Sequence, residues 1–262
     1  MFALFSSVIV FIFGLIVGSF LNCVVYRLKQ DSSFLGGRSF CPLCKHKLSW
    51  QDLIPVFSFL ILKGKCRYCQ QKISWQYPLV ELATGFLFFL VFHYTRYDIP
   101  YIVYGLIITA FLIIIFVYDL KHYLIPDKVI YPAILVSGIW YIYVFIFNRV
   151  PTYEILNTIY AAFGAASFFL FVVLISRGKW MGAGDIKLAF LMGLFLGWPA
   201  ILVALLSAFY IGALVGTGLI ASGRKTLKSE VPFGPFLVTG TFLALFFGEK
   251  LIDWYLALFL IK

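Results

Sequence analysis

The sequence predicts an all-α polytopic membrane protein with about eight transmembrane helices and a small cysteine-containing insert between the first and second helices. Of its 262 residues, 63% are hydrophobic and 12% are charged, and the mean hydropathy is +0.99. Several apolar runs approach the ~20 residues that a helix needs to cross a bilayer. One long polar stretch interrupts these runs and carries four of the five cysteines.

The spans follow one another along the chain with short polar turns between them. The first is expected over residues 2–25, and Arg27 and Lys29 mark its exit from the membrane. The chain then divides into the first helix (1–29), the insert (30–77) and a membrane core of about seven helices (78–262). The other spans are expected at 78–94, 101–118, 129–147, 155–176, 186–196, 200–221 and 235–260. The sixth of the eight, 186–196, is short for a complete crossing.

The distribution of basic residues predicts the orientation of the spans. With the insert placed in the cytoplasm and the spans alternating, all but four of the 21 Lys and Arg residues are cytoplasmic. The four exceptions are Arg96, Arg149, Lys250 and Lys262. Cytoplasmic loops of membrane proteins collect Lys and Arg, so both termini are expected outside. The same rule explains the net charge of +10, so membrane lipid is the expected partner and nucleic acid is not.

The insert contains two matched cysteine pairs, Cys41 with Cys44 and Cys66 with Cys69. Paired CxxC motifs of this spacing can close a tetrahedral Cys₄ zinc site, which is structural because it has no open position. Structural disulfides are disfavoured in the reducing cytoplasm. Thiol redox chemistry and unligated thiols are the alternatives. Cys23 lies within the first span and is expected to be a packing residue.

Four acidic residues meet a span on the cytoplasmic face: Glu81, Asp119, Asp127 and Asp185. An ionisable residue at a membrane span is costly to bury, which makes it a candidate functional residue. Asp119 ends a helix, where a negative charge opposes the helix dipole. Asp127 could instead cap the helix that follows Pro126.

The second aspartate, Asp185, follows a glycine-rich turn and could be a helix N-cap. Gly182 and Gly184 alone are ordinary loop residues, although glycines beside an aspartate also let a substrate backbone come close. Lys187 could form a salt bridge or a binding pair with Glu81, and the sequence leaves both open.

Together, Asp119 and Asp185 predict a hydrolase. If the carboxyl groups approach each other, repulsion leaves the pair with a single proton near neutral pH. The ionised carboxylate can take a proton from water, and the protonated one can donate to a carbonyl oxygen. This is general acid–base hydrolysis of a peptide bond without a covalent intermediate.

Motifs spread over nearly the whole chain resemble those of the type IV prepilin peptidases, membrane aspartic proteases of the Gly-x-Gly-Asp type. The matching segments, in order, are Gly18-Ser-Phe-Leu-Asn22, Tyr26-Arg27, Cys41-Pro-x-Cys44, Ile54-Pro55, Cys66-Arg-x-Cys69, Tyr77-Pro-Leu-Val-Glu81, Asp119-x₅-Ile-Pro-Asp127, Met181-Gly-x-Gly-Asp185-x-Lys187 and Pro232-Phe-Gly-Pro235.

The resemblance implies a multi-pass enzyme of the bacterial cytoplasmic membrane, with its active site facing the cytoplasm. It would remove the short basic leader from type IV prepilins or pseudopilins, just before their apolar segment, in pilus assembly, type II secretion or competence. The family's catalytic aspartates map onto Asp119 and Asp185, and the insert looks like its zinc-binding region. Acidic residues such as Glu81 or Asp127 are expected to attract the basic leader.

Many family members also methylate the new N-terminal amine with S-adenosylmethionine. Two departures bear on the match: Lys29 stands where the family often has Pro, and Leu53 interrupts an Asp-Asn-Ile-Pro pattern. The change at Leu53 weakens the expectation of methyl transfer more than that of proteolysis. No glycine-rich nucleotide loop of the soluble type is visible.

Two functions from other classes remain open. In an ion-coupled transporter, the paired carboxylates would carry protons or cations. In a membrane thiol oxidoreductase, the CxxC pairs would be redox-active and would not hold metal.

Overall fold

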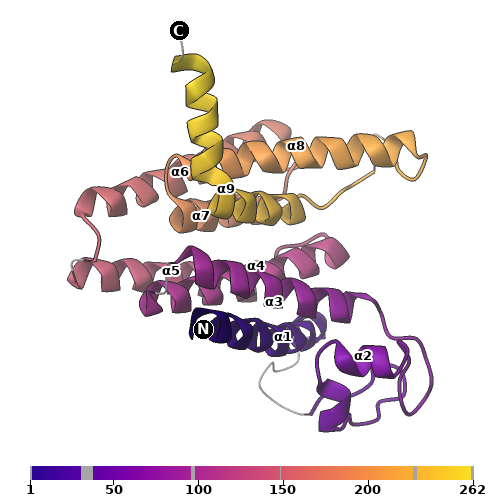
Figure 1. Ribbon diagram of the computed structural model, residues 1–262. Helices are drawn as coiled ribbons and strands as arrows, with labels where there is room; N and C mark the ends of the chain where they lie inside the picture. The colour runs from indigo at the N-terminus through magenta and orange to yellow at the C-terminus, as the bar shows by residue number, and fades with distance from the viewer. Residues whose placement is uncertain (1, 31–37, 96–97, 148, 227–228, 261–262) are drawn as a thin grey trace. The chain divides into compact units, whose positions relative to one another are not determined.

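The computed structural model describes residues 2–30, 38–95, 98–147, 149–226 and 229–260 (Figure 1). Part of the insert (31–37) and three residues used to orient the chain, Arg96, Lys228 and Lys262, lie outside the described residues. The chain forms two compact units, Met1–Ile114 and Ile115–Lys262, and the division falls inside helix α4 (Ile99–His122). Within the described ranges the fold is helical, with two isolated β-bridges in the insert.

In the first unit, α1 (Phe2–Lys29) packs along α3 (Gln76–Tyr94). A Cβ atom at Gly14 would lie 2.7 Å from the Cα of Gly85, and one at Gly18 would lie 2.8 Å from the Cα of Glu81. The glycines therefore let the two backbones approach closely, as small residues do between membrane helices. The insert connects α1 to α3 along the chain and contains the short helices η1 (Trp50–Leu53) and α2 (Phe57–Ile61).

The second unit contains the end of α4 and five further helices. These are α5 (Asp127–Ile146), α6 (Thr152–Ser176), α7 (Ala183–Leu196), α8 (Ala200–Ala221) and α9 (Gly234–Leu260). The short helix α7 is central, because it contacts α5, α6, α8 and α9. Its side chains at Leu188, Leu191 and Met192 are fully buried. The core of this unit is therefore built around α7.

Seven of the eight expected spans are helices long and apolar enough to cross a membrane: α1, α3, α4, α5, α6, α8 and α9. The chain is a multi-pass membrane protein. The expected sixth span is α7, whose 14 residues extend about 21 Å at 1.5 Å per residue. This falls short of the ~30 Å hydrocarbon core. Neighbouring helices bury seven of its 14 residues, so α7 lies in the core of the unit.

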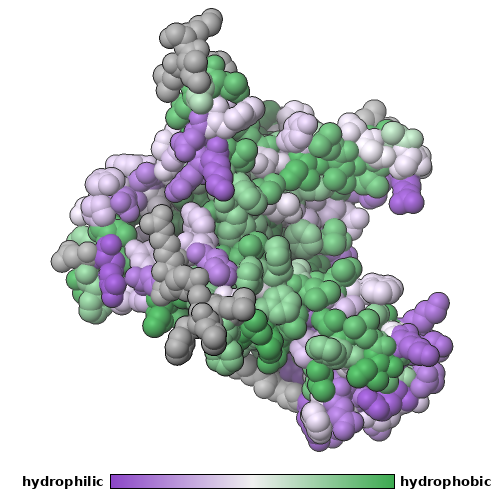
Figure 2. Space-filling view, in the orientation of Figure 1, coloured by the Kyte–Doolittle hydropathy of each residue, from purple (hydrophilic) through white to green (hydrophobic). Residues whose placement is uncertain are grey.

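Glycines also mark the helix crossings of the second unit. Gly193 of α7 lies against the backbone of Ala162 in α6, with no room for a Cβ. Gly240 of α9 lies in the same way against Ala204 and Ala208 of α8, and Figure 1 shows these two helices alongside each other. Figure 2 shows hydrophobic residues over the visible face of α8 and hydrophilic residues along the outer edge of the insert.

Candidate functional site

The two candidate catalytic aspartates lie in the second unit, each at a helix end. Asp119 is in the last turn of α4 and is 5% exposed, and Asp185 is in the first turn of α7 and is 8% exposed. Both belong to the same compact unit, and the charge of Asp119 acts on the Asp185 carboxyl through space. The fold thus buries two carboxyl groups at helix ends of the same unit, although they lie far apart in the sequence.

Each of these carboxyl groups accepts one hydrogen bond from a glycine backbone. The N–H of Gly234 donates to Oδ2 of Asp119 at 3.0 Å, and the N–H of Gly182 donates to Oδ2 of Asp185 at 3.1 Å. The described residues make no other hydrogen bond to either carboxyl group. In each carboxyl group the protein therefore fixes Oδ2, and Oδ1 is the oxygen available to water or substrate.

The expectation that Asp185 is an N-cap is corrected by the start of α7. The N-cap residue is Gly182, and Asp185 is the third helical residue, whose side chain reaches back to the N–H of Gly182. A negative charge in the first turn is favourable because the N-terminus of a helix carries a partial positive charge. The same bond fixes the rotamer of the candidate catalytic group, so a capping role does not exclude a chemical one.

The two glycines of the motif have different reasons to be glycine. A Cβ at Gly184 would lie 3.0 Å from the Cβ of Ile125, which belongs to the turn between α4 and α5. A Cβ at Gly182 would meet nothing closer than 3.9 Å. Packing therefore demands a small residue at Gly184, whereas Gly182 contributes its N–H.

The partner of Lys187, which the sequence left open, is Asp127. The Lys187 ammonium lies 2.5 Å from Oδ1 of Asp127 and over the ring of Tyr131, 4.8 Å from its centroid. Asp127 and Tyr131 are one turn apart on α5, so this contact ties the start of α7 to the start of α5. The N-cap of α5 is Pro126, and Asp127 is the first helical residue, not the cap that the sequence indicated.

Glu81 has its own partner in the first unit. Its Oε2 accepts the backbone N–H of Val56 at 2.8 Å, and the residue is 6% exposed. Val56 precedes α2 and has a positive φ of 63°, which is uncommon for a β-branched residue. Glu81 therefore anchors the insert to α3.

Gly234 is a site residue to which the sequence analysis gave no role. It opens α9, and its N–H reaches Asp119. A Cβ at this position would lie 2.5 Å from Oδ2 of Asp119. The sequence signal for this residue is a glycine between two prolines, Pro232 and Pro235, in a segment that resembles a family motif.

The four insert cysteines converge as their spacing predicts. The Sγ atoms of Cys41, Cys44, Cys66 and Cys69 all lie within 4.8 Å of one another, with Cys41 and Cys69 3.9 Å apart. Four sulfurs at ~2.3 Å from one zinc ion in a tetrahedron would be about 3.8 Å apart. A disulfide requires ~2.05 Å, and all four are free thiols. The donor set therefore fits a single tetrahedral metal ion.

The two cysteine loops have the same backbone pattern. The N–H of Cys41 bonds the carbonyl of His46 at 2.9 Å, and that of Cys66 bonds the carbonyl of Gln71 at 2.9 Å. Each loop also closes with an isolated β-bridge and contains a residue with positive φ, Lys45 or Gln70. Two equivalent loops facing each other present two sulfurs each, as a closed Cys₄ site requires.

Asp52 links η1 to the second loop. Its Oδ1 lies 2.7 Å from Nε of Arg67, and its Oδ2 accepts the hydroxyls of Tyr68 at 3.0 Å and Ser49 at 2.9 Å. Burial acts to raise the pKa of the carboxyl, but hydrogen bonds from Arg67, Ser49 and Tyr68 outweigh it and hold the pKa of Asp52 at about 2. The carboxylate is ionised at neutral pH and holds the insert together.

Comparison with protein families gives two matches. Residues 12–95 match the bacterial peptidase A24 N-terminal domain, and residues 106–217 match the type IV leader peptidase family. The first match includes the insert with its four cysteines. The second includes Asp119 and Asp185 with Gly182 and Gly184, whereas Gly234 lies beyond it.

Curated relatives match over most of their length. A prepilin leader peptidase/N-methyltransferase of Bacillus subtilis (strain 168) is 34% identical over 255 residues, covering 95% of this chain and 97% of the relative. Proteins of the same name from Aeromonas salmonicida (strain A449) and Myxococcus xanthus (strain DK1622) are 32% and 37% identical. They cover 95% and 86% of this chain, and 93% and 66% of the relatives. No solved structure matches the chain significantly.

Proposed function

The chain belongs to the type IV leader peptidase family, and from this premise we propose that it cuts the basic leader from type IV prepilins or pseudopilins with Asp119 and Asp185 as its catalytic pair. The family supports prepilin processing by a membrane peptidase. The observation that supports the assignment to these residues is the burial of two carboxyl groups at helix ends of one unit, each oriented by a glycine N–H.

The proposed reaction needs one proton on the pair. The ionised carboxylate accepts a proton from water, and the water oxygen attacks the carbonyl carbon of the scissile peptide. The protonated carboxyl donates its proton to the carbonyl oxygen, which gives a neutral gem-diol. Collapse of this intermediate breaks the C–N bond: one carboxyl group gives its proton to the leaving amine, and a hydroxyl of the gem-diol gives its proton to the other carboxylate. The single shared proton is restored at the end of the cycle.

The fixed Oδ2 atoms favour this chemistry. Because Gly234 and Gly182 each hold one carboxyl oxygen, the carboxyl groups are oriented before substrate arrives, which lowers the cost of reaching the reactive geometry. Mutual repulsion favours the singly protonated pair over the doubly ionised one.

We place the active site at the cytoplasmic face of a bacterial inner membrane, with the N-terminus outside. The asymmetric distribution of basic residues supports this orientation. A prepilin leader would then stay in the cytoplasm while its apolar segment lies in the membrane. Asp127 is 60% exposed at its side chain and is an accessible acidic contact for the basic leader. Glu81 is buried against Val56, so its contribution to leader binding would be indirect.

The Cys₄ cluster is proposed to hold structural zinc. Cys41, Cys44, Cys66 and Cys69 would supply four thiolates, and the ion would fix the two insert loops relative to each other. The convergence of all four sulfurs favours metal binding over thiol redox chemistry, which needs one reactive pair. No chemical step is assigned to the ion.

Methylation of the new N-terminus is a second candidate activity. The relatives' names include N-methyltransferase, which suggests S-adenosylmethionine as the methyl donor. In the described part of the chain there is no strand–loop–helix unit of the nucleotide-binding type. A donor site would therefore be formed by helices or by the insert. An ion-coupled transporter is not favoured, because the family and its relatives are peptidases.

The test is cleavage of a prepilin by the purified protein in detergent or vesicles. The substrate carries a basic leader followed by an apolar helix, and intact mass identifies the products. We expect loss of the leader in one cut. With S-adenosylmethionine present, the added mass of one methyl group on the mature product would establish methyl transfer. Intact prepilin after incubation with active, folded protein would contradict the proposed function.

A further inference from the structure

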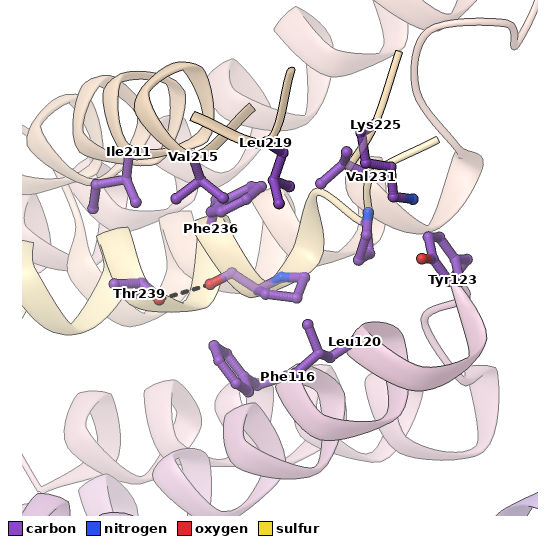
Figure 3. A pocket seen from close by; sticks show the side chains of 12 residues that line it. Phe116, Leu120, Tyr123, Ile211, Val215, Leu219, Lys225, Val231, Phe236 and Thr239 are labelled. Carbon is purple, nitrogen blue, oxygen red and sulfur yellow. Dashed lines mark hydrogen bonds between the residues drawn. The ribbon is translucent and has the colours of Figure 1, made fainter. Parts of the chain in front are cut away.

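An apolar groove of about 330 Å³ lies beside Asp119 in the second unit (Figure 3). Six of its lining residues define it here: Phe116 and Leu120 of α4, Val215 and Leu219 of α8, and Pro235 and Phe236 of α9. Figure 3 shows the α8 side chains pointing toward those of α4, with Phe236 between them. The volume is within the range of binding pockets for small molecules or for a few side chains.

The groove is lined by residues next to Asp119, although Asp119 itself is not one of its lining residues. Phe116 and Leu120 flank Asp119 on α4, and Pro235 follows Gly234, whose N–H donates to Oδ2 of Asp119. The wall of the groove and the support of the carboxyl group are therefore the same piece of chain. A ligand in the groove would have one end next to Asp119.

The groove is polar at one end only. Val215 and Leu219 are one turn apart on α8 and, with Ile211 a turn before them, form a stripe that extends about 12 Å along the helix. Beyond this stripe lies Lys225, whose ammonium donates to the carbonyl of Glu230 at 2.7 Å and lies 5.6 Å from the centroid of the Tyr123 ring.

The other end of the groove carries no free polar group of its own. The Thr239 hydroxyl donates to the carbonyl of Pro235 at 2.8 Å, drawn as a dashed line in Figure 3. Its hydrogen-bonding capacity as a donor is thus used within α9. The long wall of the groove therefore offers apolar contact. Its charged residue, Lys225, lies just beyond the end of α8.

We propose that this groove binds the first apolar turns of the peptide substrate, directly after the bond that is cut. The inference rests on the proposed function, in which the cut precedes an apolar segment. Such a segment begins at the catalytic carboxyl groups and continues into the membrane. Residues on both sides of Asp119 in α4, and Pro235 next to its partner Gly234, line the groove, which continues along the apolar face of α8, so the two match in polarity and in position.

The test fills the groove and varies the side chain that it would receive. Val215→Trp places a large ring in the groove, and Leu214→Trp is the matched control, because Leu214 is 56% exposed on the same helix and does not line the groove. Prepilins with Ala, Leu or Trp at the first position after the cut serve as substrates. We expect Val215→Trp to lower kcat/KM roughly tenfold or more for Leu and Trp, with a smaller effect for Ala.

Cleavage by the parent and by Leu214→Trp reports on the proposed function, and the difference between the two Trp variants reports on the groove. Leu219→Phe, a smaller filling change, keeps the test valid if Val215→Trp fails to fold. Equal kcat/KM for the filled variants and the parent on every substrate would overturn the groove proposal and indicate a lipid-facing surface. An equal loss on all three substrates, at unchanged thermal stability, would also overturn it.

Discussion

Gly234 occupies a position where a side chain does not fit. Its backbone is outside the left-handed region, so alanine could adopt the same conformation. The reason for glycine is therefore proximity to Asp119, whose Oδ2 would be 2.5 Å from an added Cβ. We expect Gly234→Ala to displace the carboxyl group and to lower kcat on prepilin by about 10- to 100-fold, with little change in KM.

The matched control for this substitution is Gly216→Ala in α8, where an added Cβ meets nothing within 4 Å. It should leave both kinetic constants unchanged. Steady-state cleavage of prepilin measures both variants. If Gly234→Ala cuts as fast as the parent, the contact with Asp119 does not position the carboxyl group.

Asp52 is expected to make the stability of the insert depend on pH only in acid. Its folded pKa of about 2 lies below the ordinary value of 3.8, so it stabilises the fold fully above about pH 4. This stability is lost as the pH falls toward 2. Asp52→Asn should therefore cost about 1–2 kcal/mol at neutral pH, given that Arg67 is partly exposed.

Thermal unfolding of the parent and of Asp52→Asn, followed by tryptophan fluorescence, measures this cost. The difference between the parent and Asp52→Asn should be constant from pH 5 to pH 8. A difference that changes across this interval would show that another group controls the stability of the insert.

At the scale of helices, the crossing of α6 and α7 depends on Gly193. An added Cβ would overlap the backbone of Ala162, which cannot move without separating the helices. We expect Gly193→Ala to destabilise the protein by about 1–3 kcal/mol. Because α7 also carries Asp185, the rate of prepilin cleavage should fall together with the stability.

The control is Gly164→Ala in α6, which faces open space. Alanine is a better helix former than glycine by about 1 kcal/mol, so this change should be neutral or stabilising. Thermal midpoints in detergent compare the two variants. Equal midpoints would mean that α6 and α7 are not packed at Gly193.

The insert should bind one zinc ion per chain through its four cysteines. Removing one ligand, as in Cys44→Ser, leaves three thiolates and should abolish stoichiometric zinc. Cys23→Ser is the matched control, because Cys23 lies in α1 outside the cluster. Elemental analysis of the purified proteins gives the stoichiometry. Zinc retained at one per chain in Cys44→Ser would exclude the Cys₄ site.

At the scale of the whole molecule, the sequence predicted the all-helical membrane fold and the convergence of the cysteines. The length of an apolar run directly indicates a helix that spans the membrane, and two matched CxxC pairs indicate a closed metal site. The short helix α7 was harder to predict, because its burial comes from four neighbouring helices and not from its own length.

The partners of individual side chains were beyond the sequence. Lys187 could pair with Glu81 or with another acid, and only the packing of α5 against α7 selects Asp127. The contact between Gly234 and Asp119 joins α9 to α4 across much of the chain. No periodicity or local motif encodes such a contact, because it arises when the helices pack.

The most direct test of the central claim is prepilin cleavage by Asp119→Asn and Asp185→Asn, followed by mass. Asp253→Asn makes the same chemical change at an exposed position of α9 and is the control. An amide cannot accept or hold the shared proton, so both site variants should lose the leader cut by about 10³-fold or more, while the control cuts normally. Cleavage at the parent rate by either site variant would contradict the two-aspartate mechanism.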